Sequence, residues 1–165
     1  MGKRSNMQRV DKDFYPTPYE AVVPLLPHLD AGTRFDEMCV GAFDLMAHLE
    51  LEGHTCSRHN DITHATGFDA LAVTACWGDV FITNPPYAWG ILEDLMVNFY
   101  NIAPTWLLLP ADMMHNKRMG KHMKHCLKVA SIGRVKWFGN QTGMENSAWY
   151  LFDANQLNDT RFYGR

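Results

Sequence analysis

The fold of this chain is decided by a stretch that reads Asp79-Val80-Phe81-Ile82-Thr83-Asn84-Pro85-Pro86-Tyr87. Its first part is rich in β-branched and aromatic residues, which predicts a buried strand over 79–83. Two consecutive prolines, which lack backbone N–H donors, end that strand. The polar loop 84–87 therefore follows the carboxyl end of a strand, where open α/β sheets bind their ligands.

The loop 84–87 brings together groups that suit an amino group on a planar ring. The Asn84 side chain offers a donor and an acceptor, the Pro85 carbonyl offers a second acceptor, and the Tyr87 ring offers a stacking face. Two acceptors would hold an amine nitrogen near tetrahedral geometry and free its lone pair for attack on an electrophilic carbon. The sequence therefore predicts a catalytic loop of Asn84, Pro85, Pro86 and Tyr87; the alternative is a strand that ends in a Pro-Pro turn.

Outward from this loop, segments with helical and strand patterns alternate along the chain. The expected helices cover 18–29, 42–52, 68–76, 91–100 and 114–128, and the expected strands cover 34–39, 54–60, 79–83, 105–110, 129–138 and 148–153. Strands that alternate with helices indicate an α/β fold with a mostly parallel sheet. The last two strands, joined by the polar loop 139–147, are expected to form a C-terminal antiparallel hairpin.

Length and composition fit one globular domain. The chain has 165 residues, of which 47% are apolar and 20% are charged, and this excludes an intrinsically disordered chain. We expect a basic, flexible N-terminus over 1–12 and a single catalytic domain over 13–165, with no separate target-recognition domain. The four cysteines are widely spaced and no apolar run could span a membrane, so reduced thiols and a cytoplasmic location are expected.

Positive charge gathers in two segments although the net charge is −3. The N-terminus is basic, and residues 113–144 carry seven basic side chains and no acidic one. Such asymmetry is a hint of a surface that faces a polyanion, whereas the alternative is a solvated basic helix. The residues expected to contact phosphates are Lys117, Arg118, Lys121 and Lys124, and Asn140 and Gln141 in the following loop could read base edges.

At Asn84-Pro-Pro-Tyr87 the chain resembles the DNA adenine-N6 methyltransferases that depend on S-adenosylmethionine (SAM), in particular small phage-like ones. The resemblance covers residues 13–153 and implies a Rossmann-like class I methyltransferase fold. By position in the family's motifs, Tyr15 and Thr17 would contact the methionine end of SAM. The other residues that the resemblance places at the cofactor are Glu37, Cys39 and Gly41 near its amino acid, Asp61 at the ribose, Asp69 at the adenine, and Asn84.

The glycine-rich loop departs from the family's pattern at two positions. Met38 stands where the family has proline, and Phe43 stands where it has a second glycine. Glycine there permits a positive φ or a close approach to the cofactor. Either the loop takes another path and Phe43 lines the pocket, or SAM binding is weakened or lost.

The resemblance implies methyl transfer from SAM to the N6 amine of an adenine flipped out of duplex DNA. Sequence specificity would then be low or supplied by a partner subunit, and a homodimer is a further expectation. RNA amines and protein glutamine amides are alternative acceptors, since they also present a planar NH2. A non-catalytic binding protein on a methyltransferase scaffold is the third reading. No metal is expected, because the histidine and cysteine spacings match no paired zinc motif.

Overall fold

The computed structural model describes residues 16–137, 146–156 and 159–165. These residues form one seven-stranded sheet in the order β2-β1-β3-β4-β6-β5-β7. The strands are β1 Arg34–Glu37, β2 Thr55–His59, β3 Val80–Thr83, β4 Thr105–Pro110, β5 Cys126–Arg134, β6 Asn146–Phe152 and β7 Arg161–Tyr163. The first four strands pair in parallel, β6 runs antiparallel between β4 and β5, and β7 pairs in parallel with β5.

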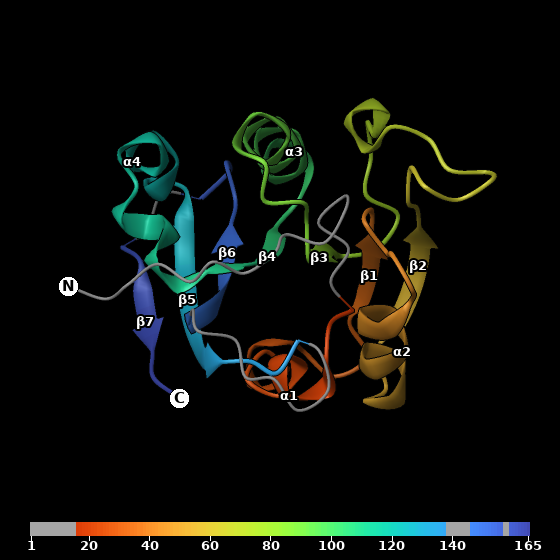
Figure 1. Ribbon diagram of the computed structural model, residues 1–165, viewed down its shortest axis with the longest axis horizontal. Helices are drawn as coiled ribbons and strands as arrows, with labels where there is room; N and C mark the ends of the chain where they lie inside the picture. Colours follow the sequence, from red (N-terminus) through yellow and green to blue (C-terminus); the bar gives the residue numbers. More distant parts are fainter. Residues whose placement is uncertain (1–15, 138–145, 157–158) are drawn as a thin grey trace.

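Helices cover both faces of the sheet (Figure 1). The α-helices are α1 Tyr19–Val22, α2 Asp44–Leu51, α3 Trp89–Ile102 and α4 Gly120–Met123, and the 3-10 turns are η2 Leu26–His28, η3 Ala70–Ala72, η4 Ala111–His115 and η5 Lys117–Met119. In Figure 1, α3 and α4 lie on one face of the sheet and α1 and α2 on the other. The result is the expected α/β architecture with a mostly parallel first half and an antiparallel C-terminal pair.

Strand β4 shows why the core has two sides. Trp106 and Leu108 pack in the cluster under α1 and α2, whereas Leu107 and Leu109 pack in the cluster under α3. Side chains alternate between the faces of a strand, so a continuous apolar run is what a strand covered on both faces requires.

A hydrogen bond on the α1 face joins an early and a late part of the chain. The indole N–H of Trp149 in β6 donates to the carbonyl of Ala21 in α1 over 2.7 Å, and both residues are fully buried. The short helix α1 is therefore held in place by a strand that is 128 residues further along the chain.

Three expected helices differ from the structure. Residues 18–29 form α1 and η2 with a turn over 23–25 between them, where Pro24 has no backbone N–H to donate. Of residues 68–76, only Ala70–Ala72 is helical, as a single 3-10 turn, because Asp69 caps it by accepting from Leu71 N and Val73 is already extended. Residues 114–128 form no continuous basic helix. The side chain of Asn116 accepts from Arg118 N and starts a new turn, and α4 ends at Met123, before β5 begins at Cys126.

The antiparallel pairing of the last two expected strands is confirmed, but its place in the sheet is not terminal. A further short strand, β7, lies outside β5 at the sheet edge (Figure 1). Three residues are too few for a recognisable alternation pattern, so this strand is not predictable from the sequence.

Candidate functional site

A cavity of about 720 Å³ opens at the carboxyl ends of β1 and β3, where the sequence placed the ligand site. The structure brings together there all of the predicted cofactor residues that it describes: Thr17, Glu37, Cys39, Gly41, Asp61, Asp69 and Asn84. Tyr15 lies outside the described residues. Five further lining residues had no motif to reveal them, namely Leu45, Thr63, Ala88, Ile91 and Leu95.

Glu37 is the buried acid of this cavity. It is 1% exposed, and its Oε1 accepts a hydrogen bond from the Thr83 hydroxyl at 3.1 Å. The backbone N–H of Asn84 also donates to its carboxylate. Its Oε2 has no hydrogen-bond partner among the described residues. Burial raises the pKa of Glu37 well above its usual value, so the site has a carboxyl group that a cationic ligand would stabilise in its charged form.

The rest of the cavity is acidic or apolar. Asp44, Asp61 and Asp69 line it, and none of the described lining residues is Lys, Arg or His. Cys39 also lines it, and burial together with the neighbouring Glu37 raises the pKa of that thiol to about 12, so the thiol is neutral. The cavity therefore suits a ligand with positive charge and apolar surface.

The loop after β1 keeps a glycine-like backbone despite Phe43. Gly41 has φ 54° and Phe43 has φ 71°, a left-handed conformation that is uncommon for a side chain of this size. The Phe43 ring stacks on His64 at 5.1 Å and meets the His59 ring edge-on at 5.3 Å. None of these three rings lines the cavity. The departure from the family's pattern therefore leaves the pocket open.

Asp61, just after the end of β2, holds the loop after β1 in place through hydrogen bonds. Its Oδ2 accepts from Gly41 N at 2.9 Å, and its Oδ1 accepts from the backbone and hydroxyl of Thr63. The Gly41 carbonyl meets His64 Nε2 at 2.8 Å. Burial alone would raise the pKa of Asp61, but the hydrogen bonds from Thr63 and Gly41 lower it. Asp61 is therefore an ionised group that shapes the cavity wall as well as lining it.

The loop that carries Asp61 depends on a glycine at its far end. A Cβ atom on Gly67 would lie 1.8 Å from the Asp61 carbonyl oxygen, closer than any real contact. Only glycine allows the loop to fold back this tightly. Asp69 follows and uses one carboxylate oxygen to cap η3, so the expected cofactor residue also has a structural role.

The loop Asn84–Tyr87 stands between the cavity and a second apolar cluster. Asn84 and Pro86 line the cavity, whereas Tyr87, like Trp89, packs against the cluster under α3. The Tyr87 hydroxyl donates to Asn84 Oδ1 at 2.9 Å, and Asn84 Nδ2 donates to the buried Thr17 hydroxyl at 3.2 Å. These two contacts fix the orientation of the Asn84 amide.

The basic segment contacts helix α3 at Trp89 and Glu93, and none of its described residues lines the cavity. The Arg118 guanidinium lies 5.8 Å from the centre of the Trp89 ring. Lys117, Arg118 and Lys124 are exposed, whereas Lys121 forms an ion pair with Glu93 in α3. Asn140 and Gln141 lie outside the described residues. The structure thus places Arg118 against Trp89, two residues after the candidate catalytic loop, and gives Lys121 an intramolecular partner.

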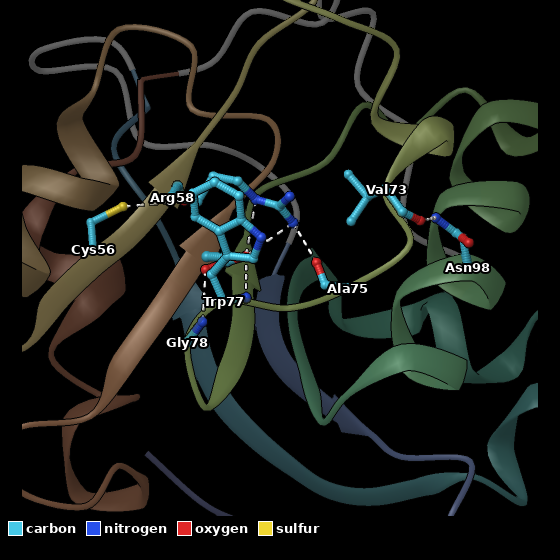
Figure 2. Close-up of polar contacts among 8 residues, drawn as sticks. Cys56, Arg58, Val73, Ala75, Trp77, Gly78 and Asn98 are labelled. Carbon is cyan, nitrogen blue, oxygen red and sulfur yellow. Dashed lines mark hydrogen bonds and ion pairs between the residues drawn. The ribbon is translucent and has the colours of Figure 1, made fainter.

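A buried ion pair supports the sheet end near η3. Asp36 in β1 is fully buried and accepts from Trp77 N at 2.9 Å, from Gly78 N at 3.0 Å and from Arg58 Nε at 3.2 Å. Arg58 also donates to the Ala75 carbonyl, as Figure 2 shows. Its guanidinium carbon lies 4.8 Å from the centre of the Trp77 ring. No sequence motif marks this cluster, which fixes the segment between η3 and β3.

The architecture is similar to that of known proteins, although the sequence is not. No family model and no curated protein matches the sequence. A proposed class I SAM-dependent methyltransferase from Listeria monocytogenes is similar in structure, with 14% identity, a TM-score of 0.61, and 96% of this chain and 68% of that chain covered. The chain has the class I SAM-dependent methyltransferase fold.

Two further structures with the methyltransferase fold are similar. One is a proposed RNA methyltransferase from Pyrococcus horikoshii, with 12% identity, a TM-score of 0.59 and 84% of each chain covered. The other is a dimethyladenosine transferase from Plasmodium falciparum, with 13% identity, a TM-score of 0.54, and 84% of this chain and 62% of that chain covered. At these identities the likeness extends to the methyltransferase fold and not to individual side chains.

Within residues 16–137, 146–156 and 159–165, no group of three or more His, Cys, Asp or Glu side chains is arranged to hold a metal ion. In the same ranges, no helix has both the length and the apolar character needed to cross a membrane.

Proposed function

We propose that this protein transfers the methyl group of SAM to the exocyclic N6 amine of adenine in DNA. One observation carries the proposal. The Asn84–Tyr87 loop has Asn84 and Pro86 on an acidic cavity and Tyr87 on the opposite side, next to an aromatic and basic surface. A donor on one side and a planar acceptor on the other would meet at this loop.

The cavity fits SAM in charge and in surface. The unpartnered Oε2 of Glu37, together with Asp44, would hold the cationic amino-acid end. Asp61 and Thr63 offer oxygens for the ribose hydroxyls, and Asp69 with Leu71 would face the adenine. When bound there, SAM supplies an electrophilic methyl group on a sulfonium centre.

The acceptor amine would be oriented by the loop itself. Asn84 Oδ1 and the Pro85 carbonyl would accept from the NH2 group, and Thr17 keeps the Asn84 amide in the required orientation. The Tyr87 ring would stack on the base. After transfer, the nitrogen is cationic and loses its proton to water, so the protein's task is positioning and no strong base is required.

DNA as the acceptor is supported by charge. Lys117, Arg118 and Lys124 are exposed, and Arg118 lies over the ring of Trp89, which packs against the same cluster as Tyr87. Basic side chains near the loop can neutralise phosphates. In duplex DNA the adenine must be flipped out of the stack to reach the loop. A specificity subunit or a second copy of the chain would supply further contacts.

The test is methyl transfer from labelled SAM to duplex DNA, RNA and protein. In the variant Asn84→Ala, transfer should fall by about 100-fold or more, the scale seen when a hydrogen-bonding group at a reaction centre is removed. Asn101→Ala is the matched control, because Asn101 is exposed on α3 and donates only within that helix, to Val97. Equal labelling of DNA by the wild type and Asn84→Ala would overturn the site assignment.

RNA is the second candidate acceptor. Two of the similar structures are a proposed RNA methyltransferase and a dimethyladenosine transferase. An adenine amine in an unpaired RNA segment would present the same planar NH2 without the need for base flipping. Label that enters RNA and not DNA would decide for this acceptor.

The hypothesis of a non-catalytic binding protein was suggested by Phe43 in the glycine-rich loop. The ring of Phe43 lies outside the cavity lining. Calorimetry with SAM tests this reading directly. No heat of binding at millimolar SAM would exclude both methyltransferase proposals and leave the binding protein.

A further inference from the structure

We propose that Glu93 is a positioning residue, which holds the Trp89 indole and the basic turns over 117–123 together as one wall of the acceptor site. This inference rests on the proposed function, because it gives that site a nucleic-acid strand as its ligand. It concerns a residue that no sequence motif marked.

Glu93 is the point at which two elements of the wall are joined. Its Oε2 accepts from Trp89 Nε1 at 2.8 Å, one helical turn earlier in α3. Its Oε1 pairs with Lys121 Nζ and lies 3.2 Å from His122 Nε2, both in α4. The buried His122 is in turn fixed by Tyr100, whose hydroxyl lies 3.1 Å from His122 Nδ1. One carboxylate thus connects an aromatic ring to the basic turns.

Two separate stripes of side chains on helix α3 face the two sides of the catalytic loop. Ile91 and Leu95 line the cofactor cavity. Trp89 and Glu93 are offset from them by two residues, which is about 200° around a helix of 3.6 residues per turn. The stripe that carries Glu93 therefore faces away from the cavity, toward the side on which Tyr87 packs.

The surface that Glu93 holds has the composition of a strand-binding platform. Trp89 and Tyr87 pack in one cluster with Met113 and Met114 of η4, and the Arg118 guanidinium lies over the Trp89 ring. Aromatic rings that stack bases beside cations that contact the phosphate backbone are the usual means of holding a single strand. A base drawn out toward Tyr87 would leave its neighbours in reach of this platform.

Loss of the Glu93 carboxylate should change the affinity for a polyanion in opposite directions, depending on whether Glu93 acts only by its charge or by positioning its neighbours. Removal of a carboxylate from a basic surface should strengthen the binding of a polyanion, since a repulsion is lost. If Glu93 instead holds Trp89 and the basic turns in place, its neutralisation should weaken that binding. Asp94, the exposed neighbour of Glu93, offers a matched control because its loss changes the charge equally.

The experiment compares Glu93→Gln with Asp94→Asn in the full chain. The readouts are KM and Kd for a single-stranded and a duplex adenine-containing oligonucleotide, Kd for SAM, and Tm. For Glu93→Gln we expect oligonucleotide Kd and KM to rise about fivefold or more, the scale of one lost stacking contact. SAM Kd should stay within about twofold, and Asp94→Asn should bind oligonucleotide as tightly as the wild type or more tightly.

A second variant keeps the test decisive if Glu93→Gln does not fold. Trp89→Phe retains an apolar ring but removes the N–H that donates to Glu93, and it should also weaken oligonucleotide binding with SAM Kd unchanged. The inference is overturned if Glu93→Gln binds oligonucleotide like Asp94→Asn, or if SAM and oligonucleotide binding fall together with Tm.

The inference and the proposed function can fail separately. A wild type that binds no oligonucleotide but methylates protein overturns the acceptor wall and the choice of DNA, and leaves methyl transfer standing. A wild type that methylates nothing but binds oligonucleotide, with the predicted loss in Glu93→Gln, overturns the proposed function and retains the wall.

Discussion

The carboxylate of Glu37, at the end of β1, accepts a hydrogen bond from the hydroxyl of Thr83, at the end of the neighbouring β3, over 3.1 Å. Thr83 directly precedes Asn84, whose N–H donates to the same carboxylate. The acid expected to hold the methyl donor is thus tied to the loop expected to hold the acceptor. Neutralisation of Glu37 should therefore weaken ligand binding and raise the stability of the protein.

Glu37→Gln should stabilise the protein at neutral pH. Since the pKa of Glu37 is raised in the fold above its usual 4.5, the buried carboxyl disfavours the native state increasingly as pH rises from 4.5 through the raised value. A neutral amide keeps an acceptor for Thr83 and removes that penalty, about 1–3 kcal/mol. Thermal melting should show a higher Tm than the wild type at pH 7.5 and a smaller difference at pH 4. A lower Tm at pH 7.5 would contradict the prediction.

SAM binding should release a proton and strengthen with rising pH. A cationic ligand favours the carboxylate form of Glu37, whose pKa is raised in the free protein. Calorimetry in phosphate and in Tris, which differ in ionisation enthalpy, should give different apparent enthalpies. The difference should shrink in Glu37→Gln, which should also bind SAM more weakly; identical enthalpies for the wild type in both buffers would contradict the role of Glu37.

Tyr87→Phe and Tyr87→Ala should separate the ring from the hydroxyl. The ring is expected to stack on the acceptor base, and loss of such stacking costs about 1–3 kcal/mol, which corresponds to a rise in acceptor KM of about 5- to 150-fold for Tyr87→Ala. Tyr87→Phe keeps the ring, loses the hydrogen bond to Asn84 and should change KM less. Tyr87 does not line the cavity, so SAM Kd should stay near wild type in both variants. An acceptor KM that is unchanged in Tyr87→Ala would exclude stacking.

Phe43→Gly should be tolerated and Phe43→Val should not. At φ 71° glycine relieves backbone strain of about 1–2 kcal/mol, which offsets the lost stacking on His64 of about 0.5–1.5 kcal/mol. A β-branched residue at this φ is a strong outlier, so Phe43→Val should lower Tm by several degrees and weaken SAM binding. Calorimetry and melting of both variants check this, and equal Tm values for the two would contradict it.

The alternation of elements made most of the fold predictable. The run Thr105–Pro110 appears as β4 with the expected bounds, because a strand buried on both faces is continuously apolar. The basic segment was wrong as a helix because lysine and arginine have high helix propensity, while the capping by Asn116 and the β-branched run into β5 act against it. Tertiary context outweighed local propensity there.

The site was predictable where it sits on strand ends, and hidden where it depends on contacts across the chain. Glu37, Asp61 and Asn84 follow strands whose order brings them together, so motif order was sufficient. The role of Glu93 depends on a meeting between α3 and α4, and no spacing in the sequence encodes it. The conformation of Phe43 is a property of the backbone that the residue type argues against.

The hydrogen bond from Trp149 to Ala21 has a consequence for synthesis on the ribosome. A helix as short as α1 has no stability of its own, and Thr17, which orients the Asn84 amide, lies just before it. Strand β6 must therefore insert between β4 and β5 before the cavity wall at Thr17 is held. A growing chain would present every motif of the site early and yet acquire affinity for its cofactor only after residue 149 has emerged.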